Sequence, residues 1–147
     1  MMATIVVGVD GSQSGQEALR VAVQEARLRG ARLRAVTAWH MTTVAYGSAG
    51  FTPGFDPALL EESASAALDA ALAELGEQAH DIAIEKVVRM GQPAQVLVEE
   101  ARGADLLVVG SRGHGGFVGL LLGSVSHQCA LHAICPIVIV HEPNRTA

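Results

Sequence analysis

The sequence is poor in three residue types. Only 3% of its 147 residues are aromatic although 50% are hydrophobic, there are two cysteines, and Lys86 is the single lysine. A core with so few aromatic rings must be built from Ala, Val, Leu and Ile, the mixture that helices packed on a parallel sheet prefer. Cys129 and Cys135 lack C-x-x-C spacing, so neither a redox pair nor a zinc knuckle is supported. Both are predicted to be small buried apolar residues.

The sequence also lacks clustered positive charge and a long hydrophobic run. The formal net charge is -5 at pH 7, whereas coating nucleic acid or an anionic membrane requires clustered cations. No apolar run approaches the ~18 residues of a membrane span, and the start of the chain has no basic and apolar leader. We therefore predict a cytoplasmic protein with neither a nucleic-acid nor a membrane partner. A chain of this length fits one domain, residues 1–147.

Apolar runs and helical repeats alternate along the whole chain. Continuous apolar runs predict strands, and apolar stripes at helical spacing predict helices. The predicted strands are 4–10, 33–39, 82–88, 105–109 and 137–140, and the predicted helices are 14–30, 56 to between 76 and 80, 93–103 and 124–133. Because connections between parallel strands are right-handed, this alternation predicts an α/β fold with a doubly wound, mostly parallel sheet and helices on both faces.

Local signals add detail to these elements. Ser14 and Glu17 have the spacing of a capping box at the start of the first helix. The adjacent charges of Glu85 and Lys86 predict that the third strand lies at an edge of the sheet. Residues 40–55 carry glycine and proline without periodicity, which predicts a long loop at the carboxyl end of the second strand. Loops in that position often cover ligands.

A glycine-containing segment follows the fourth predicted strand. Residues 110–113 are Gly-Ser-Arg-Gly, and after nine intervening residues Gly-Ser-Val-Ser at 123–126 opens the last helix. Glycine can adopt positive φ and lets backbone N–H groups approach anionic oxygens closely. The hydroxyls of Ser124 and Ser126 would lie at the positive end of the helix dipole. The pattern predicts a phosphate site, although a plain flexible loop and two capping serines fit the same residues.

Asp10 closes the first predicted strand and meets the glycine segment if the first and fourth strands are neighbours. An anion does not favour phosphate by itself, so Asp10 would accept from a ribose hydroxyl or help to hold a divalent cation. Asp before Gly11 and Ser12 is equally a good helix N-cap, and both interpretations stand. Neither G-x-x-x-x-G-K-[ST] nor G-x-G-x-x-G after the first strand is present, which disfavours P-loop NTPases and dinucleotide dehydrogenases.

These residues together resemble one known family. The spacing G-2x-G-9x-G-[ST] from Gly110 to Ser124, Asp10 at a strand end, and the Gly91-x-Pro93 turn resemble the ATP-binding branch of the universal stress protein family over essentially the whole chain. The resemblance implies five parallel strands in the order 3-2-1-4-5 and bound ATP, accompanied by Mg²⁺. It also implies a homodimer in which the last strands, Ile137–Val140, pair antiparallel, and such an apolar edge would otherwise invite aggregation.

The resemblance also implies which residues form the site. It implies that residues 8–10 line the base and ribose and that the main chain of Ala38 meets adenine. It also implies that residues 109–113 follow the ribose and phosphates and that residues 123–126 hold the phosphate chain. The complete set is Gly8, Val9, Asp10, Ala38, Val109, Gly110, Ser111, Arg112, Gly113, Gly123, Ser124, Val125 and Ser126. The role of Arg112 stays open, because that position varies in the family.

The glycine segment carries no lysine or glutamate that would position water or balance transferring charge. We therefore expect an ATP-binding regulatory protein of the stress response, which acts through conformation or a partner and has no catalytic residues. One alternative is a slow ATPase or autophosphorylating enzyme that uses Ser111, Ser124 or Ser126. Another is a dimeric interaction module that binds no ATP or a different adenine nucleotide, such as a cyclic one.

Overall fold

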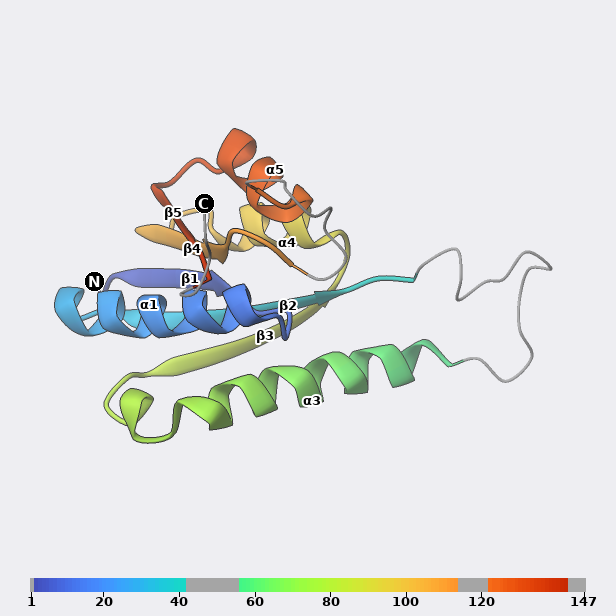
Figure 1. The fold of residues 1–147 in the computed structure, drawn as a ribbon, viewed down its shortest axis with the longest axis horizontal. Coiled ribbons are helices and arrows are strands. Elements are labelled where there is room, and N and C mark those ends of the chain that lie inside the picture. Colours follow the sequence, from blue (N-terminus) through green and yellow to red (C-terminus); the bar gives the residue numbers. More distant parts are fainter. Residues whose placement is uncertain (1, 42–55, 114–121, 143–147) are drawn as a thin grey trace.

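The computed structural model describes residues 2–41, 56–113 and 122–142. Within them, five strands form one sheet in the order β3-β2-β1-β4-β5, and every neighbouring pair is parallel (Figure 1). The elements along the chain are β1 (Thr4–Gly8), α1 (Gln13–Arg29), β2 (Arg32–Trp39), α3 (Pro57–Leu75), the 3-10 helix η1 (Gly76–Ala79), β3 (Ile84–Met90), α4 (Pro93–Glu100), β4 (Leu106–Gly110), α5 (Ser124–His132) and β5 (Ile137–Val140). The predicted α/β fold and strand order are confirmed.

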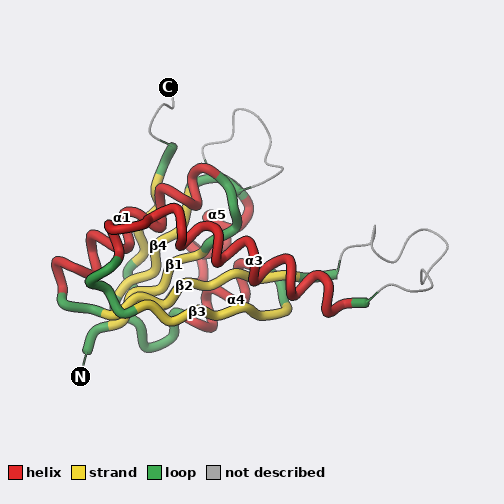
Figure 2. The backbone as a smooth tube through the Cα atoms, turned by 90° about the horizontal axis from the view of Figure 1, so that it is seen from below, coloured by secondary structure: helices red, strands yellow, loops and turns green. Residues whose placement is uncertain are grey.

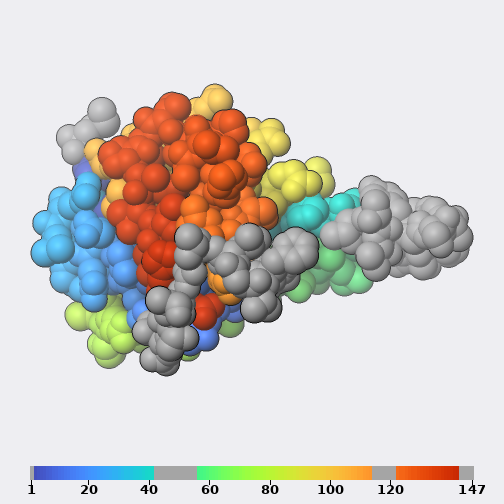
Figure 3. Space-filling view, turned by 45° about the horizontal axis from the view of Figure 1, so that its top comes forward, coloured from blue at the N-terminus to red at the C-terminus, as the bar shows by residue number. Residues whose placement is uncertain are grey.

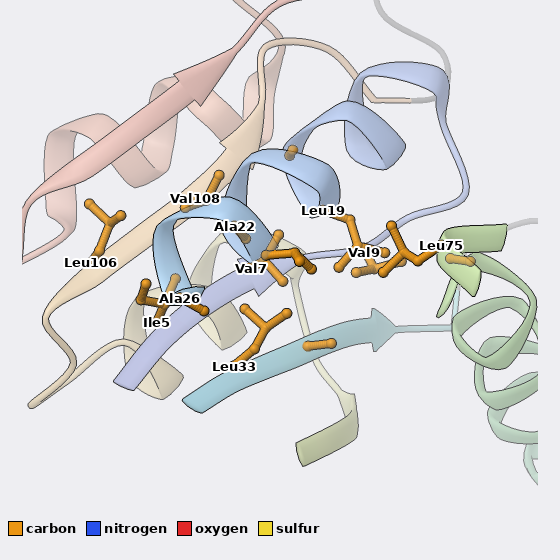
Figure 4. Close-up of a cluster of buried hydrophobic side chains, with 14 of the residues drawn as sticks. Ile5, Val7, Val9, Leu19, Ala22, Ala26, Leu33, Leu75, Leu106 and Val108 are labelled. Atoms are coloured by element: carbon orange, nitrogen blue, oxygen red, sulfur yellow. The ribbon is translucent and has the colours of Figure 1, made fainter. Parts of the chain in front are cut away.

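Helices cover both faces of the sheet (Figures 1 and 2). On one face, Ile5 and Val7 of β1 are buried in a cluster with α1 and with Leu75 of α3 (Figure 4). On the other face, Val6 is buried in a second cluster with Leu97 of α4 and with α5. Successive side chains of a strand point to opposite faces, so a central strand covered on both sides must be apolar throughout. The uniformly buried β1 meets this requirement.

The first helix begins differently from the prediction. Ser12 is the N-cap of α1, and its hydroxyl accepts a hydrogen bond from the N–H of Gly15 at 3.0 Å. Ser14 lies in the first turn and is buried, while Glu17 forms an ion pair with Arg20. The predicted capping box of Ser14 and Glu17 is therefore wrong, because Ser12, two residues earlier, already occupies the capping position.

The edges of the sheet agree with the sequence pattern. β3 lies at one edge, with Glu85 and Lys86 exposed, which confirms that prediction. β1 is shorter than predicted and ends at Gly8, so that Asp10 lies beyond the strand in the turn to α1. Most of the predicted loop at 40–55, namely 42–55, lies outside the described residues. None of the helices in the described ranges is both long enough and apolar enough to cross a membrane.

Candidate functional site

A cavity of about 750 Å³ opens at the carboxyl edge of the sheet. β1 lies between β2 and β4, and the chain passes from β1 to β2 on one side and later returns to β4 on the other. Open parallel sheets bind ligands in the crevice at such a switch point. The lining residues are Gly8, Val9, Asp10, Gly15, Val36, Ala38, His40, Pro93, Leu97, Val109, Gly110, Arg112, Gly113, Leu122, Gly123, Ser124, Val125, Ser126, His127 and Gln128.

The cavity brings together residues that were predicted from distant parts of the sequence. Every predicted site residue lines it except Ser111. Ser111 is buried behind the lining, where its N–H donates to the Val140 carbonyl at 2.7 Å and its carbonyl accepts from the Gly123 N–H at 2.6 Å. Its Oγ is buried and has no hydrogen-bond partner among the described residues. The Ser111 backbone therefore joins the exit of β4 to β5 and to the start of α5.

Two glycines of this segment, Gly110 and Gly113, are required by their neighbours rather than by their dihedral angles. None of Gly110, Gly113 and Gly123 has a positive φ, so the ability of glycine to adopt one is not used at these positions. A Cβ on Gly110 would lie 2.6 Å from Ser14 Oγ, and a Cβ on Gly113 would lie 2.7 Å from Asp10 Oδ2. Both distances are shorter than side chains tolerate. Glycine at these two positions allows the chain leaving β4 to pass directly against the start of α1.

Asp10 organises the turn between β1 and α1. Its Oδ1 accepts hydrogen bonds from Ser12 N at 2.9 Å and from Ser12 Oγ at 2.5 Å. Because Ser12 caps α1, the interpretation of Asp10 as the helix cap is wrong. The other oxygen, Oδ2, is the atom nearest to the Cβ position of Gly113. One carboxylate oxygen therefore fixes the turn, while the other lies toward the glycine segment beside the cavity.

The N-terminus of α5 borders the cavity without a side-chain cap. Gly123 is the N-cap, and no side chain forms a capping hydrogen bond at this end of the helix. The capping alternative for Ser124 and Ser126 is therefore wrong. The N–H groups of the first turn have no carbonyl partner within the helix and lie at the positive end of its dipole. Because Ser124, Val125 and Ser126 all line the cavity, this arrangement favours an anion there.

The two hydroxyls at the start of α5 differ in orientation. Ser126 is buried, and its Oγ donates to the Ser111 carbonyl at 2.9 Å and lies 3.1 Å from the Gly123 carbonyl. The prediction that the Ser126 hydroxyl faces a ligand is therefore wrong, since that hydroxyl ties α5 to the exit of β4. Ser124 is exposed at the cavity. It is the serine of this turn whose side chain a ligand can reach.

Few ionisable groups line the cavity. They are Asp10, His40, Arg112 and His127, and no lysine lines it in the described part of the chain. In the same part of the chain, no group of three or more His, Cys, Asp or Glu side chains is arranged to hold a metal ion. The site thus offers one carboxylate, a helix N-terminus and the guanidinium of Arg112, which suit an anion more than a metal ion alone.

The two cysteines lie away from these polar groups. Cys129 of α5 is fully buried in the second apolar cluster, and burial raises the pKa of its thiol to about 11. This confirms the prediction that Cys129 is a buried apolar residue. Cys135 is only half-buried against the same cluster, so the prediction of a buried residue is wrong there, although burial raises the pKa of its thiol as well.

Residues of α4 and its neighbours were missed as lining residues in the sequence. Pro93 and Leu97 of α4, His40 after β2, and Gln128 of α5 all line the cavity. The Gly91-x-Pro93 turn marks the start of this wall, but in the sequence it indicated only a helix start and the family resemblance. A second cavity of about 770 Å³ lies along α4 and α5 and shares His40, Pro93, Ser124, Val125 and Gln128 with the first. Figure 3 shows a face of the molecule on which α5 is prominent in orange and red.

The sheet order and a cavity at its switch point define a doubly wound α/β protein with a candidate ligand site beyond the carboxyl ends of its strands. The sequence profile of the universal stress protein family matches residues 1–141. The chain belongs to the universal stress protein family.

Relatives of known sequence and structure agree with this assignment. Universal stress protein Rv2005c of Mycobacterium tuberculosis is 37% identical over 140 residues, which cover 95% of this chain and 46% of the relative, so the chain spans about half the length of such relatives. Universal stress protein UspA from Lactobacillus plantarum has a TM-score of 0.75 at 25% identity, covering 94% of this chain and 97% of that one. A universal stress protein solved in complex with cAMP has a TM-score of 0.61 at 32% identity, covering 95% and 97%.

Proposed function

We propose that this chain binds ATP in the cavity at the carboxyl edge of the sheet and acts as a nucleotide-dependent regulator. The observation that carries the proposal is the uncapped N-terminus of α5 beside the glycine segment, both lining one cavity of about 750 Å³. Small-molecule and cofactor sites commonly have volumes of roughly 300–1,000 Å³. A helix N-terminus supplies N–H donors and a positive dipole end for phosphate oxygens.

In this proposal, the two ends of the cavity receive different parts of the nucleotide. The apolar wall formed by Val36, Ala38 and Leu97 takes the adenine base, with the Ala38 main chain at its edge. Gly8, Val9 and Asp10 lie beside the base and ribose. The ribose and phosphates then follow 109–113, and the phosphate chain ends against 123–126. Of these last residues, the first-turn N–H groups and the Ser124 hydroxyl are the donors that we assign to phosphate.

Asp10 fits the Mg²⁺ that accompanies ATP. Magnesium in phosphate sites is held through one or two carboxylates together with substrate phosphates, and it keeps several waters. The cavity offers one carboxylate, Asp10, whose Oδ2 lies toward Gly113. Bound Mg²⁺ would neutralise phosphate charge, and Asp10 would hold it from the side of the β1–α1 turn. The absence of a cluster of three or more metal-ligating side chains in the described ranges agrees with an ion that arrives with the nucleotide.

Holding ATP is favoured over turning it over. Among the described lining residues there is no lysine, and Asp10 is the one carboxylate. A phosphoryl-transfer site needs positioned charge on the transferring group and a residue that orients the attacking oxygen. Of the three serines considered for autophosphorylation, Ser111 and Ser126 are buried, which leaves Ser124 as the accessible candidate. Slow autophosphorylation of Ser124 therefore remains as an enzymatic alternative.

We propose that the protein forms a homodimer through β5. The strand lies at the edge of the sheet, and each of its residues Ile137–Val140 is only half-buried. An apolar edge strand presents unpaired backbone groups to another chain unless it is covered. Pairing with a second copy would cover this edge and couple two nucleotide sites.

Native mass spectrometry of the purified protein tests which nucleotide is bound. We expect a bound species with the mass of ATP, with or without Mg²⁺, which addition of excess MgATP increases. A species with the mass of cAMP would support the alternative of a cyclic nucleotide, which the relative solved with cAMP makes specific. If neither nucleotide is retained, and none binds on addition, the proposal is contradicted and the interaction module remains.

A further inference from the structure

Ser14 contacts the backbone of Arg112, a residue of the glycine segment that lies 98 positions later in the sequence. It lies in the first turn of α1 and is fully buried. Its hydroxyl donates to the carbonyl of Arg112 and accepts from the N–H of the same residue at 3.2 Å. One side chain therefore holds both polar groups of a single loop residue, directly before Gly113.

This hydroxyl has no role in starting the helix. Ser12 is the N-cap of α1, and the Ser14 hydroxyl instead hydrogen-bonds to the Arg112 backbone. A buried hydroxyl is costly unless it is hydrogen-bonded, so serine at this position is explained by the loop that it holds. Glycine at position 110 leaves room for Ser14, because a Cβ there would lie 2.6 Å from Ser14 Oγ and 2.7 Å from Ser14 C.

The contact belongs to a small clamp at the start of α1. Asp10 fixes Ser12 through its Oδ1, and Ser12 Oγ in turn lies 3.4 Å from the Arg112 carbonyl. Ser14 provides the buried part of this clamp. Arg112 and Gly113 line the cavity, whereas Ser14 does not, so Ser14 acts on the loop from behind the lining.

We propose that Ser14 is a positioning residue, which fixes the Arg112–Gly113 backbone in the conformation that receives the phosphates of the nucleotide. The inference rests on the proposed function and adds a specific residue to it. A site held in its binding conformation before the ligand arrives avoids the entropic cost of ordering the loop upon binding. Because the contact lies at the phosphate end, its removal should affect phosphate recognition and leave base recognition intact.

The test compares Ser14→Ala with the wild type in calorimetric titrations with adenosine and with MgATP. We expect ATP affinity to fall about tenfold, which corresponds to the loss of roughly one hydrogen bond, while adenosine affinity changes less than about twofold. Hydrogen exchange of the nucleotide-free protein adds a second measurement. The Arg112 amide should exchange faster in Ser14→Ala, with the protection of β4 unchanged.

Each outcome bears on a different claim. A wild type that does not bind ATP overturns the proposed function itself. A wild type that binds ATP, with a variant that binds it equally well, overturns only the role of Ser14. Equal losses for adenosine and ATP show a general structural role and also overturn it. If Ser14→Ala does not fold, Ser14→Cys keeps the approximate volume with a weaker donor and must show the same selective loss for ATP.

Discussion

Gly113 lies directly against Asp10, because a Cβ on Gly113 would come within 2.7 Å of Asp10 Oδ2. This relationship joins the glycine segment after β4 to the turn after β1. It also distinguishes Gly113 from Gly123, two glycines that look equivalent in the sequence. At Gly123, a Cβ would meet its nearest atom at 3.4 Å, which is an ordinary contact.

Alanine at these two glycines should have different effects. Gly113→Ala pushes the Asp10 carboxylate away from its position, and we expect the affinity for MgATP to fall about tenfold. Gly123→Ala adds the same methyl group where there is space and should change the affinity less than about threefold. Calorimetric titration of both variants measures the difference. Equal affinities in the two variants would contradict the proposed contribution of Asp10.

Gly8 should be intolerant of a side chain because of α4. A Cβ on Gly8 would lie 2.8 Å from Leu97 Cδ1, and Leu97 is buried. Overpacking of this kind lowers the free energy of unfolding by about 1–3 kcal/mol, so Gly8→Ala should shift the urea midpoint downward. Leu97→Val makes room, so the double variant should lose less stability than the two single losses together. Strict additivity would show that the two residues do not compete for space.

The cysteines should differ in reactivity at mildly alkaline pH. Burial raises the pKa of the Cys129 thiol to about 11, so at pH 8 almost all of it is the unreactive neutral thiol. Cys135 is less buried and should be alkylated first. Mass spectrometry after brief treatment of the folded protein with iodoacetamide measures the order. Preferential labelling of Cys129 would show that α5 leaves the core under these conditions.

The edge of β5 should pair two copies of the chain. Sedimentation equilibrium is expected to give twice the mass of the 15.2 kDa chain at micromolar concentration. Ile134, an exposed apolar residue just before the strand, offers a control. Ile134→Asp should leave the dimer intact if the strand backbone carries the pairing. A monomer for the wild type over this concentration range would contradict the proposed dimer.

The sheet was predictable because its central strands are buried on both faces. β1 and β4 are short continuous apolar runs for this reason, and the charges of Glu85 and Lys86 mark the edge strand. The start of α1 was not predictable in the same way. Ser12 and Ser14 are both hydroxyl residues close to a helix start, and the choice of the cap depends on the hydrogen bonds from Ser12 to Asp10.

That the predicted residues meet at one cavity was predictable from the sequence, but the orientation of their side chains was not. Residues 110–113 and 123–126 come together with Asp10 as expected. The inward turn of the Ser126 hydroxyl depends on the Ser111 carbonyl, which lies 15 positions earlier. The wall formed by Pro93 and Leu97 depends on the packing of α4 beside the end of β1, and the Gly91-x-Pro93 turn predicts where α4 begins but not what it packs against.

The central claim is that the uncapped start of α5 and the glycine segment hold the phosphates of ATP. Calorimetric titration with MgATP of the wild type, Gly123→Glu and Gln24→Glu tests it most directly. Both variants add one negative charge, but Gly123 is the N-cap of α5 at the cavity whereas Gln24 is exposed on α1. We expect the wild type and Gln24→Glu to bind equally well and Gly123→Glu to lose at least about tenfold in affinity, since like charges repel. Equal binding by all three proteins, or no binding by the wild type, would contradict the claim.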